Sequence, residues 1–206
     1  MLKKLLPAAL LLTAFVPAEG PWFSGKIVYH NTFKTLDGQD ITSKVAPLLG
    51  IDDPYYISNA GYKMYTDAGK LVELYSAADN QFHAYMNGQA LPVVDAATST
   101  PGAVVKPLPQ AATVAGYPCQ SLEISNPAEG TSTVYFYSPK LRVNPEAYNK
   151  HAYGDFYTYL KATKGAVPLR MVVTNSKQGF VMTSEATAVK ALPLTAADFT
   201  ADAPAR

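Results

Sequence analysis

Cysteine and histidine are the residues in this chain whose chemistry would most directly indicate catalysis or metal binding. The chain has one cysteine, Cys119, and three histidines, His30, His83 and His151. No two of them lie within four residues of each other, so neither an H-x-x-x-H nor a C-x-x-C spacing occurs. Zinc sites usually take their ligands at such short spacings. The sequence therefore predicts no metal site and no cofactor, and we expect His30 and His83 on the solvated side of strands.

Cys119 is the candidate nucleophile of the sequence. A catalytic cysteine needs a histidine and a carboxamide or acid close to it in space, and no local motif indicates that arrangement. The chain also lacks the G-x-S-x-G motif of many hydrolases and the glycine-rich loops that bind phosphates. A buried thiol at the start of a strand is the favoured interpretation. We therefore expect a protein that is not an enzyme; a cysteine-dependent enzyme would require an exposed Cys119 near a histidine.

Two acidic stretches are interpreted as turns. Residues 37–40 (DGQD) resemble part of a calcium loop, but they lack the other ligands and the terminal glutamate of such a loop. Residues 52–54 (DDP) are typical of a turn. Paired carboxylates for acid–base chemistry would require proximity in space, which these spacings do not establish.

The beginning of the chain has the pattern of a secretory signal peptide. Two lysines near the start precede an uncharged, leucine-rich run at residues 5–16. A bilayer-spanning helix needs about 20 apolar residues, whereas a signal-peptide core needs roughly 7–15. We predict cleavage after Ala18, so that residues 1–18 are the signal peptide and residues 19–206 are exported to the periplasm or secreted. The sequence contains no second long apolar run, so we expect no membrane span.

Composition favours a folded, β-rich domain. Hydrophobic residues make up 48% of the chain and charged residues 16%, which excludes a disordered chain. The formal net charge is +1 and no cluster of lysine and arginine occurs, which argues against a nucleic-acid partner. Fourteen tyrosines and eight phenylalanines favour strands, and 16 prolines with 13 glycines favour many turns. A single cysteine excludes an intramolecular disulfide.

Alternation of apolar and polar residues predicts the strands. The alternation is clearest where Leu122 and Ile124 alternate with polar residues, and turn residues at 175–179 predict a hairpin between two late strands. Residues 95–110 are predicted to be a long loop. The predicted strands cover residues 26–33, 62–67, 71–76, 82–86, 121–125, 131–138, 169–174 and 180–185.

Two segments have helical spacing. The first contains Ile41, Val45, Leu48 and Leu49 and is followed by Gly50 as a stop. The second begins with an N-cap pattern at residues 144–146, and its apolar positions are Tyr153, Phe156, Tyr157 and Leu160. An antiparallel sheet with one apolar face must cover that face. We therefore predict a mainly β (α+β) fold, in which a curved antiparallel sheet or incomplete β-barrel has short helices over its concave face.

Four short motifs carry a family resemblance. They are residues 23–29 (FSGKIVY), 115–119 (AGYPC), 165–170 (GAVPLR) and 192–199 (LPLTAADF). With them the chain resembles exported bacterial families of unknown function that are related to the lipoprotein-carrier (LolA-like) half-barrel, including the GLPGLI family. The resemblance implies a single LolA-like β domain over residues 19–206 and, by analogy with the carrier, an apolar acyl ligand. The residues that the carrier uses for partner docking have no match here, so none is carried over.

The abundant aromatic residues have two interpretations. They either form an ordinary core with cross-strand pairs, or they line an apolar cavity on the concave face. Our first functional hypothesis is an exported binding protein for a hydrophobic or lipid-like ligand in the bacterial envelope. The predicted ligand-binding residues are Ile27, Tyr29, Phe33, Leu122, Ile124, Leu169, Met171 and Val173.

The alternative is a structural or interaction module of the cell envelope that binds a protein partner and no small molecule. This alternative predicts a filled interior and an exposed aromatic patch, for which residues 135–137 (YFY) are the candidate.

Overall fold

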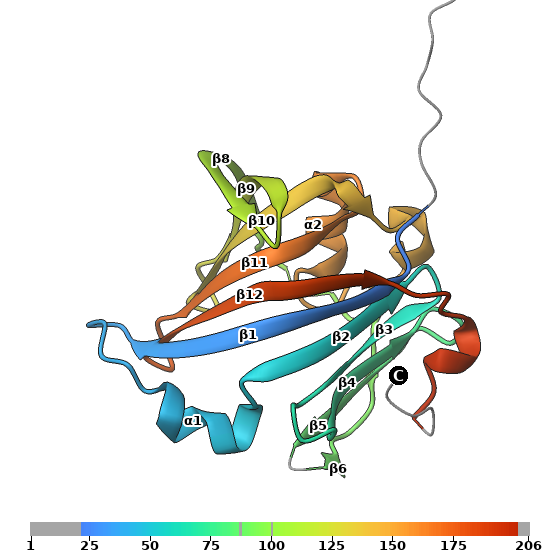
Figure 1. Cartoon of the computed structure of the whole chain (residues 1–206), viewed down its shortest axis with the longest axis horizontal. Coiled ribbons are helices and arrows are strands. Elements are labelled where there is room, and N and C mark those ends of the chain that lie inside the picture. Colours follow the sequence, from blue (N-terminus) through green and yellow to red (C-terminus); the bar gives the residue numbers. More distant parts are fainter. Residues whose placement is uncertain (1–21, 87, 100, 202–206) are drawn as a thin grey trace, which may run out of the picture.

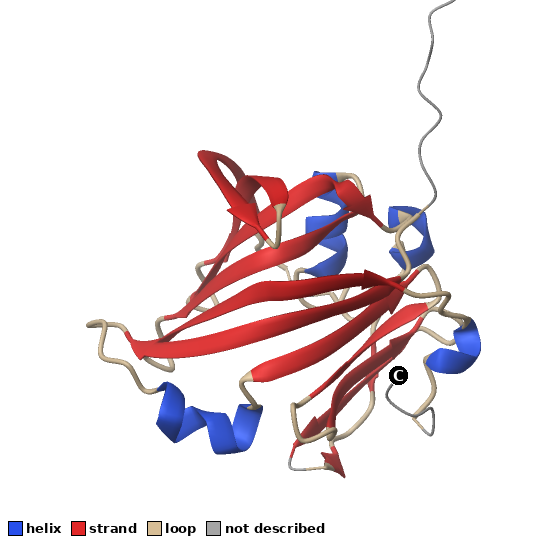
Figure 2. Ribbon diagram, viewed as in Figure 1, coloured by secondary structure: helices blue, strands red, loops and turns tan. Residues whose placement is uncertain are grey.

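Twelve antiparallel strands form one open, curved sheet in the computed structural model (Figures 1 and 2). The structure describes residues 22–86, 88–99 and 101–201, and the predicted signal peptide lies outside them. The strands of the first half are β1 (Gly25–Thr35), β2 (Asp52–Ser58), β3 (Gly61–Tyr65), β4 (Leu71–Ser76), β5 (Gln81–Met86), β6 (Gln89–Ala90) and β7 (Val94–Asp95). The strands of the second half are β8 (Val104–Val114), β9 (Tyr117–Asn126), β10 (Thr131–Arg142), β11 (Ala166–Asn175) and β12 (Phe180–Ala191).

The sheet is built from two runs of hairpins that meet at its centre. The strand order is β6-β5-β4-β3-β2-β1-β12-β11-β10-β9-β8, and β7 pairs with β5. The first and the last long strands therefore lie side by side, with Gly25 opposite Ala191 and Thr35 opposite Phe180. The register shifts between Val28 and Tyr29, where a bulge interrupts the ladder. Because β1 and β12 join the two halves, side chains from both halves of the chain can face the same space.

The predicted fold class is confirmed. The sheet is mostly antiparallel β structure, and both the meander of β3, β4 and β5 and the hairpin of β11 and β12 form as predicted.

The prediction of a loop at 95–110 is wrong, because strand β8 begins at Val104. Most side chains of β8 are exposed, and β8 lies at an edge of the sheet. Edge strands tolerate prolines such as Pro107 and Pro109, because one side of the strand has no ladder to complete. The polar, proline-rich composition that resembles a loop is thus compatible with an edge strand.

The prediction of a turn at 52–54 is also wrong, because these residues begin β2. Asp52 pairs with His30 and Asp53 pairs with Tyr29 on β1. Neighbouring side chains on β2 alternate between exposed and buried at its start. The ladder with β1 therefore overrides the local turn preference of aspartate and proline.

The first predicted helix is α1 (Thr42–Leu49), and Gly50 ends it by donating its N–H to the Ala46 carbonyl. None of its residues is buried. It connects β1 to β2 beyond the ends of those strands (Figure 1), so it does not cover the concave face as expected. The second predicted helix is split, because a short 3-10 helix, η1 (Pro145–Tyr148), precedes α2 (Phe156–Thr163).

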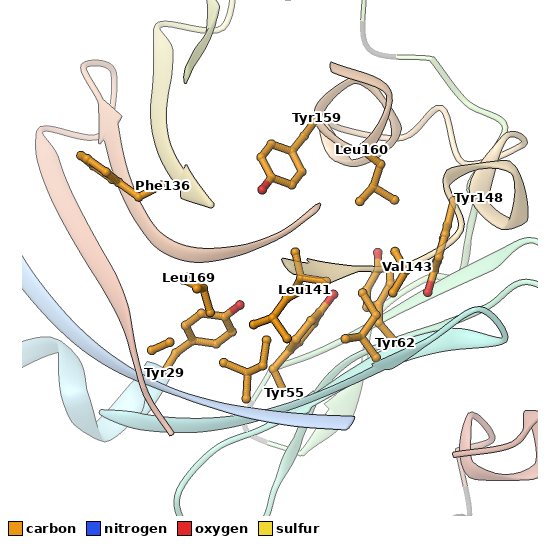
Figure 3. Packing of buried hydrophobic residues seen from close by; sticks show 14 of the residues in the cluster. Tyr29, Tyr55, Tyr62, Phe136, Leu141, Val143, Tyr148, Tyr159, Leu160 and Leu169 are labelled. Atoms are coloured by element: carbon orange, nitrogen blue, oxygen red, sulfur yellow. The ribbon is translucent and has the colours of Figure 1, made fainter. Parts of the chain in front are cut away.

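The main core lies between the sheet and α2. Tyr159, Leu160 and Thr163 of α2 are buried, and Figure 1 shows α2 inside the curve of the sheet. We call the sheet face that packs against α2 the inner face. Figure 3 shows Tyr159 and Leu160 extending from α2 toward the strands that carry Tyr29 and Tyr55.

A smaller core lies on the opposite face of β2, β3 and β4. It consists of Tyr56, Tyr65, Leu74 and Phe199. Phe199 belongs to the segment after β12, which contains the short 3-10 helix η2 (Ala196–Asp198). The end of the described chain therefore covers the outside of the first half of the sheet.

Candidate functional site

Cross-strand pairing brings acidic and aromatic side chains together on the inner face. Tyr55 of β2 pairs with Met64 of β3, and Met64 pairs with Glu73 of β4. Asp53, two residues before Tyr55, pairs with Tyr29 of β1. Directly paired residues project from the same face of a sheet. The register therefore places two carboxyl groups on the face that α2 covers.

A cavity of about 370 Å³ lies between this part of the inner face and α2. Pockets for small molecules usually measure roughly 300–1,000 Å³, so this cavity suits a small ligand. Its walls come from seven strands and one helix, which belong to both halves of the chain. The lining residues are Tyr29, Asn31, Asp53, Tyr55, Met64, Glu73, Tyr135, Asp155, Phe156, Tyr159, Pro168, Met171, Met182 and Ser184.

Aromatic rings form much of the cavity wall. The ring centroids of Tyr29 and Tyr55 are 5.9 Å apart, and those of Tyr135 and Tyr159 are 4.4 Å apart. The Tyr29 hydroxyl donates a hydrogen bond to the carbonyl of Pro168. The Tyr159 hydroxyl is buried and has no hydrogen-bond partner in the described structure. Burial raises the pKa of all four tyrosines, so they stay protonated at neutral pH.

Asp53 is a buried carboxyl with one satisfied and one unsatisfied oxygen. Its residue is 4% exposed, and its Oδ2 accepts a hydrogen bond of 2.6 Å from the Asn31 side-chain amide. Its Oδ1 has no hydrogen-bond partner in the part of the chain that the structure describes. Burial raises the pKa of Asp53 to about 6; the bond from Asn31 opposes this shift, and the charges of Asp67 and Asp52 add to it.

Two further carboxyls line the cavity. Burial, together with the charge of Asp53, raises the pKa of Glu73 to about 7. Asp155 is at the N-cap position of α2 but makes no side-chain capping bond, and burial raises its pKa. Two of the three carboxyls therefore gain or lose their charge near neutral pH. Perturbed carboxyls of this kind occur in catalytic sites and in binding sites.

The predicted ligand-binding residues are divided between the cavity and the core. Tyr29 and Met171 line the cavity. Phe33 and Val173 both pair with the cavity residue Met182 but are not among the lining residues. Their part in ligand binding stays a prediction. The four others are buried in the main core: Ile27, Leu122, Ile124 and Leu169.

The cysteine and the histidines are not among the lining residues of the cavity. Cys119 is 4% exposed, its thiol donates to the Tyr117 carbonyl, and burial raises the pKa of that thiol. The exposed His30 pairs with Asp52 at 2.8 Å. His151 is buried, its Nε2 lies 2.8 Å from the Tyr62 hydroxyl oxygen, and burial lowers its pKa to about 4.

The described residues contain no group of three or more His, Cys, Asp or Glu that could hold a metal ion. No helix among them is long and apolar enough to span a bilayer.

Comparisons with known proteins give structural matches only, since no family model and no curated protein matches the sequence. A structure of PNGF-II matches with a TM-score of 0.50 and 12% identity, over 85% of this chain. A second crystal form of PNGF-II matches with a TM-score of 0.47 and 13% identity, over 84% of this chain. This chain spans 29% of PNGF-II in both cases. At 12% identity the likeness shows a shared fold alone.

Two matches come from the group that the sequence motifs indicated. A LolA superfamily protein from Nitrosomonas europaea matches with a TM-score of 0.38 and 12% identity, over 88% of this chain and 92% of its own. An outer membrane lipoprotein-sorting protein domain from Vibrio parahaemolyticus matches with a TM-score of 0.39 and 13% identity, over 88% of this chain and 91% of its own. The predicted resemblance is thus confirmed as a likeness of fold, and at these TM-scores it carries no argument about ligand or activity.

Proposed function

We propose that this chain is an exported, non-enzymatic protein that binds a small, hydrophobic or lipid-like ligand in the cavity of its inner face. The observation that carries the proposal is the cavity itself, about 370 Å³ in volume and walled by tyrosine, phenylalanine and methionine side chains. Export rests on the signal-peptide pattern of residues 1–18, and a place in the bacterial envelope rests on the family resemblance.

The cavity wall suits a ligand with an apolar body. Burying apolar surface contributes about 25 cal/mol per Å², so even a small ligand gains affinity from such walls. Met64, Met171 and Met182 line the cavity, and methionine adapts its shape to different ligands. The ligand would therefore be recognised by burial and shape rather than by covalent chemistry.

An envelope protein partner is the second candidate, and one surface feature favours it. Leu48, Leu49 and Met86 are 63%, 47% and 61% exposed and lie around a hollow of about 120 Å³. The aromatic strand expected for this role is not an exposed patch, since Phe136 is 8% exposed and Tyr135 faces the cavity.

A Leu48→Ser, Leu49→Ser variant that loses binding to envelope extracts, while keeping ligand binding, would assign the two roles to separate surfaces.

The cavity proposal is tested with a neutral apolar fluorophore, N-phenyl-1-naphthylamine. We expect saturable binding with one site per chain, seen as an increase in fluorescence. Met182→Trp fills the cavity and should weaken binding at least tenfold. Val104→Trp, which changes a 55% exposed side chain on β8, is the matched control and should bind like the wild type.

Circular dichroism of both variants establishes that they fold, so that lost binding reports on the cavity. Native mass spectrometry of protein purified from an exporting host provides an independent measurement, in which a bound lipid-like species is expected. Unsaturable fluorescence, or equal binding by the wild type and the filled variant, would refute the proposal.

A further inference from the structure

We propose that the ligand of this cavity is an organic cation, in which an ammonium or amidinium group is attached to an apolar body. The inference rests on the proposed function, because it specifies the ligand of the same cavity. Three observations support it: the charge of the lining, two polar atoms without partners, and the arrangement of the aromatic rings.

The lining carries acidic groups without basic ones. Asp53 comes from β2, Glu73 from β4, and Asp155 from the start of α2. None of the fourteen described residues that line the cavity is a lysine, arginine or histidine. Burying ionised groups without a counter-charge is costly, so such groups are usually paired. A cationic ligand would supply the counter-charge that these three carboxyls lack within the lining.

Two buried polar atoms of the lining lack hydrogen-bond partners in the described structure. One is Oδ1 of Asp53, whose residue is 4% exposed, and the other is the hydroxyl of Tyr159, whose residue is 2% exposed. Buried polar groups nearly always have a partner, and an unsatisfied one destabilises the fold. Both atoms are covered by protein, so a cation in the cavity would act on the Asp53 carboxyl through its charge rather than through a hydrogen bond.

The aromatic rings provide the remaining part of a cation site. Tyr29 and Tyr55 on one side, and Tyr135 and Tyr159 on the other, form two ring pairs in the lining. The negative faces of such rings attract ammonium and guanidinium groups. A metal ion would instead need a close set of oxygen ligands, and the described residues contain no group of three or more acidic, cysteine or histidine side chains that could hold one. Carboxyls combined with ring faces therefore favour an organic cation.

The test compares three probes that share an eight-carbon chain and differ in their head group: octyltrimethylammonium, 1-octanol and octanoate. Each is titrated against the full chain by calorimetry at pH 8, below its aggregation concentration. We expect octyltrimethylammonium to bind most tightly and octanoate most weakly, with at least a tenfold difference in Kd between them. The permanent charge of octyltrimethylammonium keeps the probe unchanged when the pH is varied.

Variants locate the charge that the cation recognises. Glu73→Gln and Asp155→Asn keep the side-chain shape and remove the charge, so together they should weaken octyltrimethylammonium at least tenfold and leave 1-octanol unchanged. Glu129→Gln removes an exposed carboxyl between β9 and β10 and is the control. Asp53 is left intact in these variants because Asn31 bonds to it.

The pH dependence gives a second readout. The titratable groups of the lining are Tyr29, Asp53, Tyr55, Glu73, Tyr135, Asp155 and Tyr159, and Asp52 and Asp67 act on Asp53 from outside it. Lowering the pH from 8 to 5 protonates Glu73, with its pKa of about 7, and Asp53, with its pKa of about 6. The affinity for octyltrimethylammonium should therefore fall over this range, while that for 1-octanol stays constant.

The outcomes separate this inference from the proposed function. If all three probes bind equally, or octanoate binds best, the cavity binds apolar ligands and the cation inference is wrong. If neither the three probes nor N-phenyl-1-naphthylamine binds, the proposed function itself is wrong. Preference for the cation that the double variant and low pH both abolish would establish the inference.

Discussion

The two faces of β2, β3 and β4 bury opposite charges in similar aromatic surroundings. On the inner face the paired row is Tyr55, Met64 and Glu73, and on the opposite face it is Tyr56, Lys63 and Leu74. Lys63 is 1% exposed, and its Nζ lies 5.5 Å from the ring centroid of Tyr56 and 5.3 Å from that of Tyr65.

The two faces differ in whether the fold supplies both the charged group and the groups that surround and balance it. On the opposite face the fold itself supplies a cation and the rings around it. On the inner face the fold supplies rings and carboxyls, together with a cavity of about 370 Å³. The opposite face is therefore filled by groups of the protein itself and has a structural role. The inner face has space for a group from another molecule.

The largest effect is expected on the opposite face, at Phe199. This side chain is 2% exposed, and a Cβ added to Gly61 would lie 3.1 Å from its ring, so it packs directly on β3. Phe199→Ala should lower the free energy of unfolding by about 3–5 kcal/mol, because it leaves a cavity in a small core. Urea denaturation measures the change.

The control for this prediction is Leu48→Ala, which shortens a 63% exposed side chain of α1. It should change the free energy of unfolding by less than about 0.5 kcal/mol. A loss below about 1 kcal/mol for Phe199→Ala would show that the segment after β12 is not part of the structural core.

Tyr148 provides the next largest effect, on the inner side. The one proton of its buried hydroxyl is shared between the carbonyls of Ser58 and Gly61, at the end of β2 and the start of β3. Tyr148→Phe removes the hydroxyl and keeps the ring, so both carbonyls lose a buried donor. We expect a loss of about 1–3 kcal/mol in the free energy of unfolding, measured by urea denaturation. An unchanged stability would contradict the view that η1 is anchored to the sheet through this group.

The sheet was largely predictable from the sequence because its signals are local. Alternation and turn residues correctly predicted the hairpin of β11 and β12, where Met171 and Val173 alternate with polar or opposite-facing neighbours. The errors come from long-range pairing. Asp53 has the local preference of a turn residue, yet the ladder between β1 and β2 places it in a strand. β8 resembles a loop because an edge strand needs few buried side chains.

The candidate site was predictable only in part, for the same reason. Tyr29 and Met171 follow from strand alternation, since a single strand fixes which side chains share a face. Glu73 lies in a predicted strand, but its role depends on Asp53, which is 20 positions earlier and was interpreted as a turn residue. The position of Asp155 in the site depends on the residue at which α2 begins. Proximity of these carboxyls is a property of the tertiary fold, and no short motif encodes it.

Glu73→Gln tests the inner-face carboxyls through stability. The pKa of Glu73 is raised from 4.5 to about 7, so between these values the folded state binds more protons than the unfolded state. The contribution of Glu73 is therefore fully present below about pH 4.5 and is lost as the pH rises through 7. We therefore compare the free energy of unfolding of Glu73→Gln with that of the wild type at each pH. This difference should shift in favour of the variant by roughly 1–2 kcal/mol when the pH is raised from 4.5 to 8.

The comparison of variant with wild type at each pH isolates Glu73 from other groups. His151 acts in the opposite sense, because its pKa is lowered from 6.5 to about 4 and its contribution to stability is lost as the pH falls through that range. Both proteins share His151, so its effect cancels in the difference. A difference that does not depend on pH would mean that Glu73 is well solvated in the folded protein.

The smallest effect is expected at Tyr159, and it completes the comparison with Tyr148. Both tyrosines are buried on the inner side, but the Tyr159 hydroxyl has no hydrogen-bond partner in the described structure. Tyr159→Phe therefore removes no bond and should change the free energy of unfolding by less than about 0.5 kcal/mol, or raise it slightly, because an unsatisfied polar group leaves the interior. Because a trimethylammonium group has no N–H to donate to the hydroxyl, the same variant should bind octyltrimethylammonium like the wild type. A loss of stability as large as that of Tyr148→Phe would show that Tyr159 is a structural donor, and the inner face would then resemble the closed, opposite one.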